Sequence, residues 1–372
     1  MRIVGGQVFT GSKFERRDVA VSGDRFVEAV GACDDGQTID AVGCYVIPGL
    51  VDIHFHGSAG SDMSDGDLEG LHRMGAYEAS RGVTAMCPAT MTLPEDVLLR
   101  AAKAARAYEP AADEAALVGI NMEGPYISPG KVGAQNPAHV RTPDAEEFRR
   151  LQKAAGGLFK LVDIAPEEPG ADEFIASLAS DVRISVAHTK VDYDTAKRAF
   201  SKGACHVTHL YNAMPGLHHR DPGPIPAAVE NPHVTAEIIA DGVHIHPAMV
   251  RLAFKLFGDD RMVLVSDTLR AAGLGDGVYD LGGQDVTVEG PVATIAAGNL
   301  AGSVSDLMRC LVVAVRDMGI PLASAVKAAA SNPARAIGLA DRGAIEPGRI
   351  ADVVVLDEDL NIRCVVVRGT VL

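Results

Sequence analysis

Short apolar runs typical of β-strands alternate with helical segments through the central part of the chain, starting at residues 51–57. Helical segments such as 93–108 and 143–155 separate these runs, a pattern that indicates βαβ units and a parallel sheet. About eight such strands suggest a closed (β/α)8 barrel. A doubly wound open sheet is the alternative, but no GxGxxG motif opens a helix after a strand. The later strand-like runs are residues 82–90, 116–125, 158–167, 182–189, 203–214, 234–244 and 261–268.

The two ends of the chain consist of short strand-like pieces with turn signals and lack this alternation. They cover residues 1–47 and 343–372 and flank a central region, residues 48–342, which is long enough for a single barrel. We therefore expect a barrel domain beside one small discontinuous β-sandwich domain that both ends form together.

Charge and cysteine usage restrict the partners and the compartment. The net charge is -15, and no basic stripe is available to neutralise the phosphates of a nucleic acid. No apolar run approaches the roughly 20 residues that span a bilayer, and residues 1–18 lack the apolar segment of a signal peptide. The 6 cysteines show no CxxC spacing, as in a reduced protein. We expect a cytoplasmic protein that binds neither nucleic acid nor membrane.

Histidines and carboxylates fall at the carboxyl ends of the predicted strands. Parallel barrels place their active sites at this edge, so several such side chains at successive strand ends predict one shared site. They are His54, His56, Glu123, His188, His209, Asp241, His244 and Asp267.

The pair His54 and His56 is the most informative part of this set. Side chains alternate along a strand, so both imidazoles should point the same way, with Asp52 one step below them. Two inward imidazoles would repel each other if protonated and are costly to bury unpaired. A divalent metal removes both problems because neutral imidazole is a common ligand of zinc and iron. A lone buried histidine is usually a hydrogen-bonded core residue, but the pair among other strand-end ligands favours a metal site.

Glu123 and Asp267 each have a structural alternative. Glu123 follows an apolar strand and could form an ion pair with a lysine such as Lys190, but metal ligation ranks first. Asp267 ends another apolar run and could be a helix N-cap. Beside a metal it is well placed as a general base, which is the interpretation favoured here.

Several motifs together resemble the amidohydrolase superfamily and, within it, the N-acetylglucosamine-6-phosphate deacetylase family. The superfamily signals are "PGLVDIHFHG", the later strand-end aspartate and "GAIEPGRIADVVVLD". Motifs shared with the narrower family run in consistent order through the central region. They are "MEGPYISPGKVGAQNP", "DIAPE", "VTHLYNAM", "HHRDPG", "ADGVHIHP" and "LAGS".

The resemblance implies an amidohydrolase-type barrel and a set of residue roles. Glu123, His188 and His209 would hold one catalytic zinc or iron ion, and His54 and His56 a second. Asp267 would be the catalytic acid and base. Residues at the substrate would be Ala134, Gln135, Asn212, Ala213, His219, Arg220, Asp241, His244, Leu300, Ala301 and Gly302.

The implied activity is metal-dependent removal of the N-acetyl group from N-acetyl-D-glucosamine 6-phosphate, in amino-sugar catabolism or cell-wall recycling. The implied active form is a homodimer in which Arg220 reaches the sugar phosphate of the neighbouring subunit. Departures from the family pattern at Leu269, Arg270 and Asp306 leave the exact sugar open.

Three other functions stay open at this point. One is deacetylation of the galactosamine isomer. Another is a cyclic-amide hydrolase of the dihydroorotase or hydantoinase type, which usually needs a strand-end lysine that is not equally placed here. The third is a non-catalytic, metal-containing sugar-phosphate binding protein, against which Asp267 argues.

Overall fold

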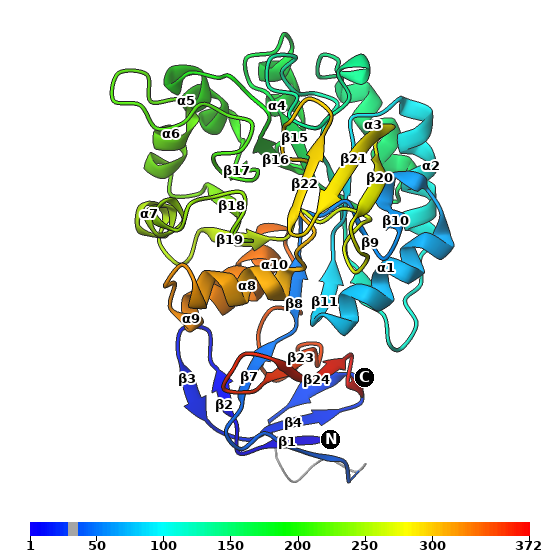
Figure 1. Cartoon of the computed structure of the whole chain (residues 1–372), viewed down its shortest axis with the longest axis vertical. Coiled ribbons are helices and arrows are strands. Elements are labelled where there is room, and N and C mark those ends of the chain that lie inside the picture. The colour runs from blue at the N-terminus through cyan, green and yellow to red at the C-terminus, as the bar shows by residue number, and fades with distance from the viewer. Residues whose placement is uncertain (29–35) are drawn as a thin grey trace.

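The computed structural model describes residues 1–28 and 36–372 and places a barrel beside a smaller all-β region (Figure 1). Residues 29–35, which include Cys33 and belong to the end region predicted to be strand-like, lie outside the described residues. No described helix is both long and apolar enough to cross a membrane.

The central strands form a parallel barrel. The first part is a 3-stranded sheet in which β11 (Val83–Met86) lies between β8 (Leu50–Asp52) and β13 (Ala116–Leu117). The barrel continues as a 7-stranded parallel sheet. Its first two strands, β12 and β14, follow β11 and β13 in the chain and continue the same two staves of the barrel. Its strands, in order, are β12 (Ala89–Thr90), β14 (Ile120–Met122), β15 (Phe159–Ile164), β16 (Arg183–Val186), β17 (His206–Val207), β18 (Thr235–Ile239) and β19 (Met262–Val265).

Backbone hydrogen bonds beyond the last strand close the barrel at the site edge. The amide of Asp267 donates to the carbonyl of His54 at 2.9 Å, and the amide of His56 donates to the carbonyl of Thr268 at 2.8 Å. The end of β19 thus lies against the end of β8. The predicted (β/α)8 barrel is confirmed.

Helices follow most of these strands and cover the outside of the barrel (Figure 1). Aspartate side chains accept hydrogen bonds from first-turn amides at several helix starts, for example Asp144 before α3 and Asp192 before α5. The helices are α1 (Leu68–Ser80), α2 (Glu95–Ala107), α3 (Ala145–Ala154), α4 (Ala171–Leu178), α5 (Tyr193–Lys202), α6 (Pro224–Glu230), α7 (Pro247–Phe257), α8 (Leu307–Arg316), α9 (Leu322–Val326) and α10 (Asn332–Ala336). Shorter elements are η1 (Met63–Asp65), η2 (Pro137–His139), the π-helical turn η3 (Lys327–Ser331), β9 (Gly57–Ser58) and β10 (Ser61–Asp62).

The two ends of the chain share a sheet. β7 (Tyr45–Pro48) pairs antiparallel with β23 (Val353–Leu356), so that Ile47 lies opposite Val354. The 6-stranded sheet also holds β24 (Ile362–Val367), β25 (Thr370–Val371), β2 (Gln7–Phe9) and β3 (Phe14–Arg16). A 4-stranded sheet adds β1 (Arg2–Val4), β4 (Val19–Ser22), β5 (Arg25–Val27) and β6 (Thr38–Asp40).

An apolar cluster that includes Ile3, Val21, Val46 and Val353 fills the core of this region. The domain boundaries at residues 47 and 343 stay a prediction.

A three-stranded antiparallel sheet was not predicted. It comprises β20 (Gly277–Leu281), β21 (Gln284–Glu289) and β22 (Val292–Ile295) and lies near the barrel mouth (Figure 1). Its strands alternate polar and apolar residues, and glycine pairs or single glycines make the turns, for example Gly282 and Gly283 at positive φ. This alternation is the signal that could have found it.

Candidate metal centre

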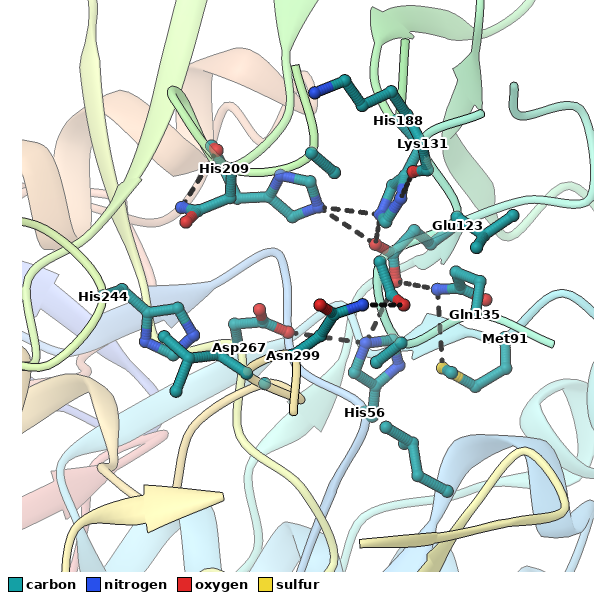
Figure 2. A pocket seen from close by; sticks show the side chains of 18 of the residues that line it. His56, Met91, Glu123, Lys131, Gln135, His188, His209, His244, Asp267 and Asn299 are labelled. Atoms are coloured by element: carbon teal, nitrogen blue, oxygen red, sulfur yellow. Dashed lines mark hydrogen bonds and ion pairs between the residues drawn. The ribbon is translucent and has the colours of Figure 1, made fainter. Parts of the chain in front are cut away.

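A cavity of about 450 Å³ opens at the carboxyl ends of the barrel strands. The loops after β8, β14, β16, β17, β18 and β19 bring buried imidazoles and carboxylates to its floor (Figure 2). The predicted site residues that line it are His56, Glu123, Ala134, Gln135, His188, His209, Asn212, Ala213, His244, Asp267, Leu300 and Gly302.

Glu123 lies at the centre of this cluster, and its first oxygen faces two imidazoles. Oε1 is 2.8 Å from Nε2 of His188 and 3.1 Å from Nε2 of His209. The two Nε2 atoms are themselves 3.1 Å apart. The ion pair with Lys190 that was the alternative for Glu123 is not what the structure shows, because the carboxylate contacts imidazoles and Gln135 instead.

The hydrogen bond on the far side of His188 decides which nitrogen carries the proton. Nδ1 of His188 lies 2.9 Å from the backbone carbonyl oxygen of Lys131, and a carbonyl only accepts. Nδ1 must therefore carry the hydrogen, so Nε2 of the neutral ring presents a lone pair to Glu123. A lone pair and a carboxylate oxygen at this distance repel each other unless a proton or a metal ion lies between them.

The second oxygen of Glu123 faces the other pair of histidines. Oε2 is 3.0 Å from Nε2 of His56 and 3.6 Å from Nε2 of His54, and it accepts a hydrogen bond from Gln135 at 2.9 Å. Oδ1 of Asp267 is 3.4 Å from Nε2 of His56 and 3.8 Å from Nε2 of His54. Glu123 thus separates two groups of candidate ligands: His188 and His209 form one group, and His54 and His56 form the other.

Burial and charge in this cluster fit a divalent metal. The side chains of His54, His56, Glu123 and Asp267 are almost inaccessible to solvent, and Nε2 of His54 has no hydrogen-bond partner among the described residues. Possible ligand atoms of His54, His56 and Asp267 lie within 4.8 Å of one another, as do those of His54, Glu123 and His209. Imidazole and carboxylate together suit zinc or iron.

The pKa shifts show that the cluster attracts positive charge. Burial lowers the pKa of His56, but Glu123 and Asp267 outweigh burial and raise it to about 10. Burial raises the pKa of Glu123, but the charges of His54 and His56 and the contacts with the imidazoles of His188 and His209 hold it well below its ordinary value. The carboxylates stay ionised at neutral pH, and positive charge on the imidazoles or on a bound metal ion balances them.

The backbone at several of these residues adopts a conformation that is rare for residues with a side chain. φ is 41° at His188, 28° at His209, 52° at Asp267 and 51° at Ala213. Non-glycine residues at positive φ cluster at functional sites, where the surrounding structure enforces them. No helix begins directly after Asp267, so its alternative role as an N-cap is not observed.

Asp241 does not line the cavity but holds a residue that does. Its Oδ2 accepts from Nδ1 of His244 at 2.8 Å, and its Oδ1 accepts from the backbone amides of Val243 and His244. Burial lowers the pKa of His244, but the hydrogen bond to Asp241 and its charge raise it above the ordinary value. In Figure 2, Asp267 lies between His244 and His56. A proton on His244, which this raised pKa favours, makes its Nε2 a donor toward the cavity.

Four other residues singled out from the sequence do not line the cavity of this chain. His54 lies beneath the floor, and Ala301 packs in an apolar cluster below the three-stranded sheet. His219 and Arg220 are exposed in the loop before α6, where Nη1 of Arg220 lies 2.7 Å from Nε2 of His219. Any contact of these two residues with a substrate must therefore come from another subunit or from movement of the loop.

The three residues at which the sequence departs from the family pattern do not line the cavity. Leu269 is buried in the apolar cluster under the three-stranded sheet, and Arg270 forms ion pairs with Asp65 and Asp280. Asp306 caps the start of α8. None of Leu269, Arg270 and Asp306 is among the described residues that line the cavity. Asp52 likewise accepts from Ser266 instead of joining the ligands.

Two supporting features were not found from the sequence. Gln284 donates to the backbone carbonyl of Ala134 at 2.6 Å, and Asn299 donates to that of Gly133 at 3.2 Å. The three-stranded sheet and the loop after it therefore support the cavity wall. Glu237 lies beneath the floor and accepts from His54 at 2.8 Å. A glutamate inside the apolar strand run 234–244 was the signal that could have drawn attention to it.

Comparison with known proteins gives consistent matches along the chain. The model of the amidohydrolase family matches residues 45–372. The N-acetylglucosamine-6-phosphate deacetylase of Bacillus subtilis (strain 168) is 36% identical over 332 residues, which cover 88% of this chain and 84% of that protein. The N-acetylgalactosamine-6-phosphate deacetylase of Escherichia coli O157:H7 is 34% identical over 325 residues, or 87% and 86% of the two chains.

Solved structures match over the full length. A mutant of the N-acetyl-D-glucosamine-6-phosphate deacetylase of Mycobacterium smegmatis, in complex with N-acetyl-D-glucosamine-6-phosphate, superposes with a TM-score of 0.92 at 35% identity. The match covers 100% of this chain and 98% of that one.

Proposed function

Because the chain belongs to the amidohydrolase family, we propose that it hydrolyses the N-acetyl group of N-acetyl-D-glucosamine 6-phosphate to D-glucosamine 6-phosphate and acetate. The resemblance to deacetylases of this substrate, inferred above from motifs, is confirmed by relatives of that name over most of the chain. The cytoplasmic location stays a prediction.

One observation carries the proposal: a single buried carboxylate, Glu123, separates two groups of imidazoles at the barrel mouth, with Asp267 beside them. We assign Glu123, His188 and His209 to one Zn²⁺ or Fe²⁺ ion. His54 and His56 are the candidate ligands of a second. When bound, such an ion supplies a Lewis acid that polarises a carbonyl oxygen and acidifies water.

Asp267 is the residue that moves the proton. Burial raises its pKa, but the hydrogen bond from His56 and the charges of His54 and His56 lower it, so the carboxylate is ionised and can accept a proton at neutral pH. It would take the proton from the attacking water and return it to the departing amine nitrogen. General acid–base catalysis of this kind contributes roughly 10²–10⁴-fold in rate.

His244 and the cavity wall hold the substrate. With Nδ1 donating to Asp241, the raised pKa of His244 favours the protonated ring, whose other nitrogen can donate to an oxygen of the substrate. Gln135, Asn212 and the backbone at Ala213 and Gly302 line the same space and offer further polar contacts. Ala134 and Leu300 provide apolar surface beside them.

The cavity of one subunit offers few basic side chains for a phosphate. Among the described residues that line the cavity, Lys131 is the one lysine, and no arginine is present. We propose a homodimer in which the exposed Arg220, with His219 beside it, reaches the 6-phosphate in the neighbouring subunit. A planar guanidinium suits this role because it donates two parallel hydrogen bonds.

The galactosamine isomer is a second candidate substrate, since a relative named for that activity is 34% identical. A cyclic-amide hydrolase that bridges two metals with a lysine is less compatible, because Glu123 occupies the position between the two groups of imidazoles. The deciding experiment measures acetate release from both 6-phosphorylated N-acetylhexosamines and from unphosphorylated N-acetylglucosamine. Release from neither phosphorylated sugar by metal-loaded protein would contradict the proposal.

A further inference from the structure

Glu237 is a fully buried carboxylate outside the cavity. It lies on β18 between Ala236 and Ile238, and none of its surface is exposed. It is not among the residues that line the cavity, and the mechanism above gives it no role. A buried carboxylate is costly unless several donors satisfy it.

Donors from three different parts of the barrel satisfy both of its oxygens. Oε2 lies 2.8 Å from Nδ1 of His54 and accepts from the backbone amide of His209 at 3.1 Å. Oε1 lies 2.9 Å from Nε2 of His206. Because a carboxylate only accepts, both imidazole nitrogens must carry hydrogens. Nδ1 of His206 then accepts from the hydroxyl of Thr235 at 2.5 Å.

This arrangement places a hydrogen on Nδ1 of His54. With the hydrogen on Nδ1, the neutral ring presents the lone pair of Nε2 to the cluster, where that atom has no hydrogen-bond partner among the described residues. It lies 3.6 Å from Glu123 Oε2 and 3.8 Å from Asp267 Oδ1. Glu237 thereby sets both the orientation and the tautomer of this ring.

The same oxygen also holds the backbone of His209. That residue has φ of 28°, a conformation that needs enforcement from its surroundings. Its imidazole belongs to the group formed with Glu123 and His188, whereas His54 belongs to the other group. One carboxylate oxygen therefore contacts a member of each group from below.

We propose that Glu237 is a positioning residue that holds His54 and His209 for metal binding in both groups, and that His206 orients Glu237. The inference rests on the proposed function, because it assumes that the cluster binds a divalent metal. Carboxylates that orient ligand histidines typically contribute roughly 10–100-fold to metal affinity.

The test compares Zn²⁺ affinity in the full-length protein and its variants by competition with a chromophoric chelator. Glu237→Leu keeps the volume but removes the acceptor, and its affinity should fall roughly 10–100-fold. Glu237→Gln can still accept from His54 and His209 through its amide oxygen. Its amide nitrogen can donate to Nε2 of His206 once the hydrogen of that ring moves to Nδ1, where the hydroxyl of Thr235 can accept it. The loss in this variant should be smaller, about tenfold. Asp163→Asn is the control, because Asp163 is equally buried and accepts from Thr208.

A second measurement does not depend on activity. The visible absorption of bound Co²⁺ reports ligand geometry and should change in Glu237→Leu but not in Asp163→Asn. Zn²⁺ binding by Glu237→Leu as tight as in the wild type would overturn the inference, and so would an equal loss in Asp163→Asn. If Glu237→Leu does not fold, unchanged affinity in Glu237→Gln overturns it. A wild-type protein that binds no Zn²⁺, Fe²⁺ or Co²⁺ would instead contradict the proposed function itself.

Discussion

The Nε2 atoms of His188 and His209 lie 3.1 Å apart and face the same carboxylate oxygen of Glu123. The carbonyl of Lys131 takes the hydrogen of His188 Nδ1, so the ring can bind a cation through Nε2 without being protonated. Three ligand atoms that converge in this way are typical of a metal site.

Removal of divalent metal should abolish acetate release while most of the fold remains, because the barrel core is apolar and does not depend on the cluster. Glu123→Ala should act in the same way. Metal content, circular dichroism and acetate release measure the three effects. Glu114→Ala is a matched control, since Glu114 is a buried carboxylate that pairs with His72 away from the cavity. Full activity in rigorously metal-free protein would contradict this prediction.

The double substitution His54→Ala/His56→Ala should lower the number of ions bound per chain. The two imidazoles face the second oxygen of Glu123, and their loss leaves too few ligands on that side. Metal analysis of purified protein gives the stoichiometry, with His72→Ala as the control. A ratio near one ion per chain in both the wild type and the double mutant would show that the pair is not a ligand set.

Arg220→Ala should raise KM for the 6-phosphorylated sugar. A charge-assisted bidentate contact contributes about 1.5–3 kcal/mol, which corresponds to roughly one to two decades in affinity. Activity on unphosphorylated N-acetylglucosamine should hardly change. Arg149→Ala is the control, because this exposed arginine pairs only with Glu146 among the described residues. An equal loss on both substrates would refute the phosphate contact.

Mixed dimers test whether Arg220 acts in the neighbouring subunit. A hybrid of Asp267→Asn and Arg220→Ala chains contains one site with both residues intact, so some activity should return after mixing. Subunit exchange is verified separately with differently tagged chains. Exchange without any return of activity would rule out action across the interface.

Asp241→Asn should move the alkaline limb of the pH–activity profile to lower pH. Asp241 raises the pKa of His244, so the imidazolium donor persists to higher pH and is lost only as pH rises through that raised pKa. Without the carboxylate, the same loss occurs at lower pH. The profile of kcat/KM measures the shift, with Asp163→Asn as the control. An unchanged alkaline limb would mean that His244 does not act as a charged donor.

The position of the site could be predicted from the sequence because strand-end residues of a parallel barrel meet at one edge. His54, Glu123 and His188 follow apolar runs, and the structure brings them together as that rule requires. Their roles as ligands stay predictions. The rule does not predict which side chains contact each other below the strand ends. Glu237 was therefore missed, although it lies within an apolar strand run.

Loop positions could not be predicted in the same way. Leu269 and Arg270 are close in sequence to Asp267, yet they turn away into an apolar cluster and an ion pair. The partner of Arg270, Asp65, is 205 residues away in sequence, and its approach depends on how the loops pack over the barrel. The sequence around Leu269 and Arg270 contains no hydrophobic periodicity that would predict where their side chains point.

The proposed role of Asp267 is tested by acetate release from N-acetyl-D-glucosamine 6-phosphate by wild-type protein and by Asp267→Asn at equal metal content. We expect measurable turnover for the wild type. For the variant we expect a loss of roughly 10²–10⁴-fold, because the amide cannot take the proton from water. Substrate binding and bound metal should be retained. Turnover by Asp267→Asn at the wild-type rate, or none by the metal-loaded wild type, would contradict the assignment.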